Sequence, residues 1–277
     1  MRIIIRLFSR RWLLTTLLVL AATGVLIRLG IWQLDRLQTR RASNAQVVSQ
    51  VNQPVLKLDA DGLSSGNIQP ENLSEMEYRK VVVSGEYDPS QEVALRNQVW
   101  HDQYGVHLLT PLHIKDSNIV VIVDRGWIPG GDFSAGESIG AWPQFMEPGQ
   151  VTVYGVIRRQ QTKPDLGRIS DPTPFPGQGR ITAWNLSNLE QMQRQLPYPI
   201  LPVYIQQSPD PAWTKMPYRS EPELDLTEGP HMGYALQWFS FAAILIVGYP
   251  FYVRRDVLRS EKESVKKLQE SAQYSGD

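Results

Sequence analysis

The stretch PHMGYALQWFSFAAILIVGYPFYVRR, residues 230–255, decides how this 277-residue chain is organised. Residues 232–253 carry no formal charge. A helix of that length, rising about 1.5 Å per residue, crosses a hydrocarbon layer of roughly 30 Å. We therefore predict a transmembrane helix over residues 230–253.

A second apolar run lies near the start of the chain, at residues 12–27. It extends to Trp32 if the Arg28 side chain reaches the membrane interface, which predicts a first span over residues 12–32 after a short segment, 1–11. A cleaved export signal is the competing interpretation, because Ser9-Arg10-Arg11 partly resembles a twin-arginine motif. The apolar pattern persists beyond the point where a signal peptide turns polar, which favours the span.

Basic residues predict the orientation of the two spans. Arginines precede the first span, and six basic residues follow the second: Arg254, Arg255, Arg259, Lys262, Lys266 and Lys267. The positive-inside rule then puts both chain ends in the cytoplasm, with residues 33–229 on the other side of the membrane. Four arginines on that other side run against the rule: Arg28, Arg36, Arg40 and Arg41. The segment 254–277 is predicted to be a charged, solvated tail.

Composition excludes several classes of protein. The formal net charge is zero, and no basic cluster lies outside the chain ends, which argues against nucleic-acid binding. The chain has no cysteine, so disulfides, thiolate catalysis and cysteine-ligated metals are excluded. The remaining length suffices for one folded domain.

The segment between the spans is predicted to be β-rich. Short runs of β-branched and aromatic residues alternate with Gly, Pro, Asp and Asn clusters, at residues 78–87, 93–98, 107–112, 119–127, 151–159 and 202–207. Such strands favour an antiparallel sheet or small barrel, which makes the chain an α+β membrane protein. One short helix is predicted from Ser187, where the spacing to Glu190 is that of a capping box. Residues 51–75 and 161–179 are predicted to be loops.

Chemistry-bearing motifs are sparse in this segment. His101, His107 and His113 are spaced by six, but on one strand this separates neighbours by roughly 20 Å, too far to share a metal without a turn at Tyr104-Gly105. No nucleophile elbow, phosphate loop or zinc-protease motif is present, so we predict that the chain is not an enzyme. For Asp124-Arg125-Gly126-Trp127, residue chemistry favours a surface ion pair and a packing tryptophan at a tight corner.

His231 stands at the start of the second span. A helix puts His231, Tyr234, Ala235 and Trp238 on one face, so the imidazole would lie at the membrane surface near aromatic rings. A neutral imidazole there can ligate a haem iron, with the macrocycle against Tyr234, Trp238 or the first span. The alternative is a hydrogen bond at the interface, and for Tyr234 and Trp238 simple aromatic anchoring.

Several short motifs occur in an order that resembles the surfeit locus protein 1 family, nearly from end to end. They include Gly30-Ile31-Trp32-Gln33 with Arg36, Tyr78-Arg79, Gly85-Glu86-Tyr87, Arg96-Asn97, Gly105 before Pro111-Leu112, the run from Val123 to Pro129 (VDRGWIP), Val153 to Gly155, and His231 with Tyr234-Ala235 and Trp238-Phe239. The VDRGWIP run and the spacing after His231, between two spans, are the most specific.

The resemblance implies a two-span assembly factor for haem-copper cytochrome c oxidase in respiratory-chain biogenesis. It implies a bacterial inner-membrane protein with a periplasmic domain, which supplies haem a to the catalytic subunit of the oxidase. We expect the β domain to dock on the oxidase or, alternatively, on the haem a synthase. The chain's other contact is membrane lipid. A membrane scaffold or chaperone that holds oxidase subunits without binding haem is the alternative.

The resemblance also suggests residues for the haem. His231 matches the histidine thought to be the axial iron ligand of bacterial relatives, with Tyr234, Trp238 and Trp32 against the macrocycle. Gly30 would permit close approach of the helices or the macrocycle. Arg36 or Arg125 would pair with the propionates, although solvated interface charge is the simpler interpretation of Arg36. The family commonly has Asn before this histidine, whereas this chain has Pro230, which alters the start of the helix.

Overall fold

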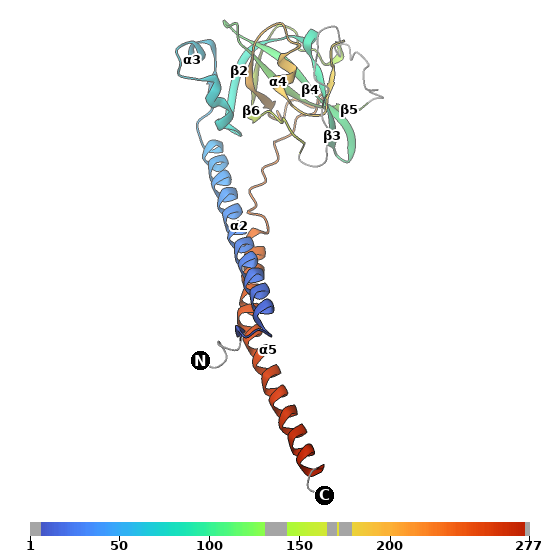
Figure 1. Cartoon of the computed structure of the whole chain (residues 1–277). Helices are drawn as coiled ribbons and strands as arrows, with labels where there is room; N and C mark the ends of the chain where they lie inside the picture. The colour runs from blue at the N-terminus through green and yellow to red at the C-terminus, as the bar shows by residue number, and fades with distance from the viewer. Residues whose placement is uncertain (1–6, 131–142, 165–170, 172–178, 275–277) are drawn as a thin grey trace. The chain divides into compact units, whose positions relative to one another are not determined.

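The computed structural model describes residues 7–130, 143–164, 171 and 179–274. The chain forms two compact units, each described here by itself (Figure 1). A helical unit comprises residues 1–44 and 226–277, and a β unit comprises residues 45–225. This division lies inside the predicted inter-span segment of residues 33–229.

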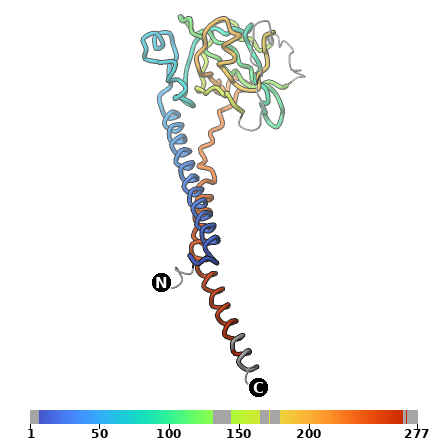
Figure 2. The backbone as a smooth tube through the Cα atoms, viewed as in Figure 1, coloured from blue at the N-terminus to red at the C-terminus, as the bar shows by residue number. Residues whose placement is uncertain are grey.

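Two long helices make up the helical unit. They are α2 (Leu13–Val51), whose last residues belong to the β unit, and α5 (His231–Tyr274) (Figures 1 and 2). Both are long and apolar enough to cross a membrane, judged by length and composition. Each continues well beyond its predicted span, and the tail after residue 254 is helical. The backbone continues through Pro250, which lacks the amide proton of a regular helical bond.

The two helices pack antiparallel along a narrow seam. The most buried residues of α2 recur every seven positions, at Thr16, Thr23, Gly30 and Leu37. On α5 the buried alanines Ala235 and Ala242 have the same interval. Half-buried residues fill the positions between them, which gives the alternating three-and-four spacing of coiled-coil packing. Small side chains in this seam let the two backbones approach closely.

The β unit is built on an eight-stranded sheet that closes on itself. The strand order is β1-β2-β6-β8-β5-β4-β3-β7, and an additional pairing of β2 with β4 closes a ring of β2, β6, β8, β5 and β4. The strands are β1 (Leu56–Leu58), β2 (Lys80–Tyr87), β3 (Val93–Trp100), β4 (Gln103–Ile114), β5 (Val120–Pro129), β6 (Gln150–Arg159), β7 (Ala183–Trp184) and β8 (Ile200–Gln207). The predicted small barrel is thus present.

The sheet is mixed, which corrects the prediction of an antiparallel one. Strand β8 is antiparallel to β6 but parallel to β5. The physical reason lies in the closure: strand directions cannot alternate all the way round a ring with an odd number of strands, so at least one neighbouring pair must be parallel. The outer strands β1 and β7 also pair in parallel.

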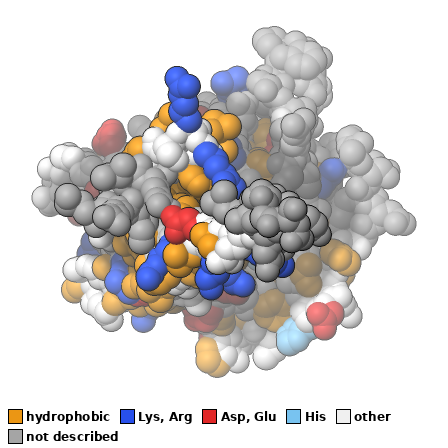
Figure 3. Space-filling model, turned by 60° about the horizontal axis from the view of Figure 1, so that its bottom comes forward, with side chains coloured by type: hydrophobic (Ala, Val, Ile, Leu, Met, Phe, Trp, Pro, Cys, Tyr) orange, Lys and Arg blue, Asp and Glu red, His pale blue; other side chains and the backbone are white. Residues whose placement is uncertain are grey.

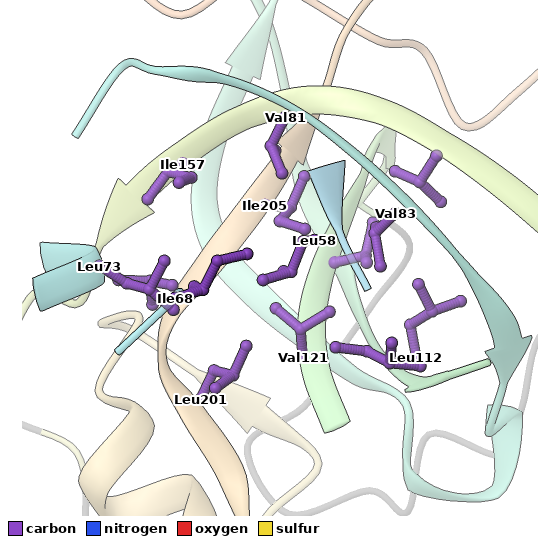
Figure 4. Packing of buried hydrophobic residues seen from close by; sticks show 14 of the residues in the cluster. Leu58, Ile68, Leu73, Val81, Val83, Leu112, Val121, Ile157, Leu201 and Ile205 are labelled. Carbon is purple, nitrogen blue, oxygen red and sulfur yellow. The ribbon is translucent and has the colours of Figure 1, made fainter. Parts of the chain in front are cut away.

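The six predicted strands all occur, with ends shifted by up to four residues. Strand β2 shows the expected alternation of buried and more exposed residues. Strand β5 instead has every residue buried except Pro129, because both of its faces are covered. The largest cluster of buried apolar side chains, which includes Val81, Leu112 and Ile205, fills the space between the strands (Figure 4).

The helix and loop predictions need correction. The helix predicted from Ser187 is α4 (Leu189–Gln193), and its N-cap is Asn188, whose side chain accepts a hydrogen bond from the amide of Gln191. Residues 51–75 are not simply a loop, since they contain β1, the short helix α3 (Ala60–Ser64) and most of the 3-10 helix η1 (Pro70–Met76). Two short 3-10 helices are η2 (Pro89–Gln91) and η3 (Pro143–Phe145). Most of the loop predicted at 161–179 lies outside the described residues.

Candidate functional site

His231 is the first residue of α5 and is held by a hydrogen bond to the facing helix. Its Nδ1 lies 2.8 Å from Oε1 of Gln33 on α2. Both side chains are half-buried and occupy seam positions. The interface hydrogen bond considered for His231 is therefore present, and it uses one of the two ring nitrogens.

The segment before α5 is tied to α2 as well. Arg41 donates two hydrogen bonds to the carboxylate of Glu228, at 2.7 and 2.8 Å. The side-chain amide of Asn44 donates to the carbonyl of Leu226 at 2.7 Å. The chain then turns at Gly229, whose φ of +68° favours glycine. These contacts determine where α5 begins relative to α2.

The hydrogen bond to Gln33 also indicates which nitrogen of His231 carries the proton. With the amide oxygen of Gln33 as acceptor, Nδ1 carries the proton and Nε2 retains its lone pair. A Cβ at Gly229 would lie 3.6 Å from Nε2, an ordinary contact distance, so Nε2 lies close to the backbone of Gly229. His231 therefore presents a nitrogen lone pair at Nε2, and a neutral imidazole nitrogen of this kind can ligate a haem iron.

The aromatic residues predicted beside His231 do not share one surface. Trp238 is half-buried in the seam, and its ring meets that of Phe241 edge-on at 6.2 Å. Tyr234 and Trp32 are 47% and 42% exposed, so they face away from the seam. An outward position suits a ring that contacts lipid or a flat apolar ligand.

Gly30 provides close contact between the helices. A Cβ at this position would lie 2.6 Å from the Phe239 ring, so the ring occupies the space that glycine leaves. Gly24, one turn and a half earlier on α2, has nothing within 4 Å of such an atom. The structure thus fills the space beside Gly30 with Phe239.

Arg36 lies one turn beyond Trp32 on α2. Its guanidinium carbon is 5.7 Å from the centre of the Trp32 indole, and the side chain is exposed. The pair presents a cation and an aromatic face on the outer surface of the same helix. An anionic group can bind to this exposed pair, and water can equally solvate it.

Arg125 belongs to the β unit, where it is buried. Its side chain is 2% exposed, and it bonds Glu92 at 3.0 Å and Glu147 at 3.1 Å. Arg219 lies 3.5 Å from Glu147, and the Arg125 guanidinium carbon lies 4.9 Å from the centre of the Tyr87 ring. We call Tyr87, Glu92, Arg125, Glu147 and Arg219 the Arg125 cluster.

The Arg125 cluster corrects the interpretation of the VDRGWIP run as a surface ion pair. The ion pair is internal because both faces of β5 are covered. Burial also raises the pKa of the Tyr87 hydroxyl well above its usual range. A haem propionate would have to replace one of the two carboxylates to reach Arg125. The expected packing tryptophan is present, since Trp127 is 1% exposed, but the expected corner is not: Gly126, with φ of +118°, lies inside β5 where the β4–β5 register shifts.

The evenly spaced histidines lie apart. His101 is in the turn between β3 and β4, so this turn falls at His101-Asp102 and not at Tyr104-Gly105. His107 Nδ1 lies 2.8 Å from Oδ2 of Asp124, whereas the ring of His113 packs edge-on against Tyr198 at 4.7 Å. The described residues contain no group of three or more His, Asp or Glu side chains suited to a metal ion.

Sequence reasoning missed the contacts that surround the predicted residues. Gln33 was quoted in a motif but given no role, and Phe239 likewise. A polar side chain three residues after a seam glycine is a usable signal, because the alternating spacing puts it in the seam. Glu92 and Glu147 carried no comparable signal, since their pairing with Arg125 depends on long-range packing.

Comparisons with known proteins agree on one family. A model of the SURF1 family matches residues 20–243. A SURF1-like protein of Rickettsia conorii is 26% identical over 248 residues, covering 87% of this chain and 92% of that protein. Surfeit locus protein 1 of Mus musculus is 25% identical over 258 residues, covering 86% of this chain and 75% of that protein. A SURF1-like protein of Caenorhabditis briggsae is 23% identical over 255 residues, covering 85% of this chain and 74% of that protein. The family match runs from within α2, through the β unit, into the first part of α5, and this chain belongs to the SURF1 family.

Proposed function

We propose that this protein is a membrane-inserted, non-catalytic assembly factor for a haem-copper cytochrome oxidase, and that it holds haem a through His231. The observation that carries the haem proposal is the His231–Gln33 hydrogen bond, which leaves Nε2 as the available nitrogen. The resemblance of the motif order to the surfeit locus protein 1 family supports the choice of oxidase assembly.

Membrane insertion is supported by the outer surface of the helical unit. Large apolar side chains face outward on both helices, among them Leu14 at 72% exposed and Ile244 at 64%. Water disfavours such a surface, whereas lipid tails accommodate it. We propose that both chain ends are cytoplasmic and that the β unit is periplasmic, because the basic residues that follow the uncharged stretch 232–253 of α5 outnumber those shortly before it.

When bound, haem a would supply an iron centre that the oxidase later uses. This chain's own residues would bind and orient it. His231 offers Nε2, and the hydrogen bond to Gln33 fixes the orientation of the ring. Trp32 and Tyr234 offer outward aromatic faces, and Arg36 offers a cation beside Trp32. Arg125 is omitted from this set because its guanidinium is buried against carboxylates.

The partners proposed are the catalytic subunit of the oxidase and the haem a synthase. A scaffold that brings oxidase subunits together without haem is the second candidate, and the packed seam at Gly30 and Phe239 favours it. The two functions differ in their dependence on His231. A scaffold needs the folded units but not the free nitrogen.

The first test uses the full-length chain purified from cells that make haem a. We expect the absorption spectrum of the purified protein to show bound haem, and His231→Ala to remove most of it. His113→Ala is the matched control, since His113 is a part-exposed histidine of the β unit. Equal haem in wild type and His231→Ala would remove His231 from the mechanism. Assembly of oxidase that persists with His231→Ala would favour the scaffold.

A second test reads the role of Gln33 without haem. Gln33→Glu keeps an oxygen acceptor for Nδ1, whereas Gln33→Leu removes it. We expect nitrogen-15 chemical shifts of the His231 ring to report a protonated Nδ1 in wild type and in Gln33→Glu, where the carboxylate also favours protonation of Nε2. In Gln33→Leu the tautomers should mix. Identical spectra for all three proteins would contradict the positioning role of Gln33.

A further inference from the structure

The charged part of α5 carries a shallow, open groove between its own side chains. Every described residue that lines it belongs to α5: Phe251, Arg254, Arg255, Leu258, Arg259, Lys262 and Glu263. The intervals from Phe251 to Arg255, Leu258, Arg259 and Lys262 are those of one helix face. All the lining side chains are exposed. The space-filling view shows Lys and Arg side chains next to apolar ones on the face that it displays (Figure 3).

The charges of this groove are poorly balanced within the described chain. Arg259 pairs with Glu263 at 3.1 Å, but both side chains are largely exposed. Arg254, Arg255 and Lys262 have no carboxylate partner among the described residues. The nearby Asp256 pairs with Arg11 at 3.1 Å, so its carboxylate does not neutralise the groove. The groove therefore retains an excess of positive charge.

We propose that this groove binds the headgroup of an anionic phospholipid. The occupant must carry both an anion and an apolar tail, because Arg255, Arg259 and Lys262 lie on the same face as Phe251 and Leu258, which are 64% and 49% exposed. The groove lies on the candidate membrane-spanning helix, where its uncharged residues 232–253 give way to basic ones, so a lipid whose tails lie against Phe251 places its phosphate among the basic side chains. A free phosphate ion has no apolar tail that could contact Phe251 and Leu258.

The inference rests on the proposed membrane insertion of α5, and it adds a lipid site to that function. Basic residues next to a span attract anionic lipids electrostatically, and the attraction weakens with salt. The lining also orients a bound lipid along α5. Its apolar residues begin at Phe251, next to the uncharged stretch, and its basic residues extend to Lys262. The site is independent of His231, which lies at the other end of the span.

The test uses the full chain reconstituted in phosphatidylcholine vesicles that contain a trace of spin-labelled phosphatidylglycerol. Electron spin resonance measures the fraction of labelled lipid immobilised by the protein, compared with spin-labelled phosphatidylcholine. We expect a preference for phosphatidylglycerol of roughly fivefold, the contribution of about one fully effective basic residue. The preference should fall in 1 M NaCl by the screening of exposed charges.

Two triple variants separate the site from total charge. Arg255→Gln with Arg259→Gln and Lys262→Gln should lower the preference to about that of phosphatidylcholine, near one. The matched control is Lys80→Gln with Lys163→Gln and Arg194→Gln, which removes the same charge from exposed positions of the β unit. An unchanged preference in the first variant, or an equal loss in both, would overturn the lipid site.

Two further readouts distinguish the remaining outcomes. Alkaline carbonate extraction tests insertion: release of the wild-type chain from the vesicles would overturn both the proposed insertion and this site. A chain that stays inserted but shows no lipid preference would overturn the site alone. Inorganic phosphate at matched ionic strength should displace the labelled lipid no better than chloride does, and stronger displacement would assign the groove to free phosphate.

Discussion

The β unit and the helical unit differ in what they bury. The β unit buries charged side chains in pairs, as in the Arg125 cluster and the His107–Asp124 contact. Among the described residues of the helical unit, the fully buried side chains are small or apolar, apart from Thr16 and Thr23. The helical unit instead turns its large apolar side chains outward. This difference is what the proposed membrane insertion predicts, since outward-facing apolar side chains suit lipid and not water.

The largest effect is expected at Arg125. Arg125→Met leaves Glu92 and Glu147 without their buried cation, and breaking a buried ion pair typically costs about 3–5 kcal/mol. We expect this loss in the free energy of unfolding of the β unit, followed by the fluorescence of Trp127 and Trp184, both fully buried. The helical content in far-ultraviolet circular dichroism should persist.

The matched control for Arg125 is an exposed ion pair. Arg159 lies 3.4 Å from Glu77, with 48% of its side chain exposed. Arg159→Met should cost less than about 1 kcal/mol, because solvent screens the pair. Similar losses at Arg125 and Arg159 would mean that burial does not set the strength of the Arg125 cluster.

The next effect is expected at Gly30, in the helical unit. Gly30→Ala forces the Phe239 ring to move, and overpacking of this kind costs about 1–3 kcal/mol. Gly24→Ala meets no atom within 4 Å and should be neutral or slightly stabilising. Because the chain has no cysteine, spin labels on introduced cysteines at Leu18 and Ile246 can report the helix separation.

A double variant sharpens the Gly30 prediction. Phe239→Ala should restore the close approach of the helices in the Gly30→Ala background, since the two positions share one space. Equal label distances in Gly24→Ala and Gly30→Ala would contradict the tight contact.

A smaller effect concerns pH in the β unit. Burial alone would lower the pKa of His107, but the charge and hydrogen bond of Asp124 outweigh it, so the pKa is raised. The pair therefore stabilises the fold fully below the unfolded-state pKa of about 6.5. That stabilisation is lost as pH rises through the higher folded-state pKa.

Urea unfolding between pH 6 and pH 9 can measure this loss. We expect stability to fall with pH in the wild type and to fall less in His107→Gln. His113→Gln is the control, because His113 is part-exposed and lies 4.0 Å from its nearest carboxylate oxygen, in Asp88. A pH dependence unchanged by His107→Gln would contradict the prediction.

The smallest effect is expected at Tyr249. Its hydroxyl lies 2.8 Å from Oγ1 of Thr16, a contact between the two helices. Such interhelical hydrogen bonds average about 0.6 kcal/mol in membranes. Tyr249→Phe should change the separation reported by labels at Leu18 and Ile246 very little, because Thr16 retains the carbonyl of Trp12 as a partner. A separation as large as that of Gly30→Ala would contradict this ranking.

Local sequence pattern predicted much of this fold. Periodicity and turn residues located the six main strands, and uninterrupted apolar runs located both long helices. The sequence pattern did not predict the two-residue strand β7 or the three-residue strand β1. Both are too short to show a period, and they form through parallel pairing with distant strands. The parallel β5–β8 pair follows from ring closure, which no local pattern encodes.

The candidate site was predictable only in part. His231 was found because it begins an apolar stretch, and the structure adds Gln33, which faces it from 198 residues away. The burial of Arg125 was missed because the charge suggested a surface position. Its two carboxylates come from residues 92 and 147, on either side of it in the chain. Pairings across such separations depend on packing that the sequence pattern does not report.

The ties between Arg41 and Glu228, and between Asn44 and Leu226, have a consequence for axial slippage. A seam that repeats every seven residues is degenerate: sliding α5 by one heptad, about 10.5 Å, again brings small side chains against small ones. Packing alone would then tolerate several alignments. The polar contacts at the start of α5 form in only one of these alignments, and they keep the imidazole of His231 at a single position along α2, beside Gln33.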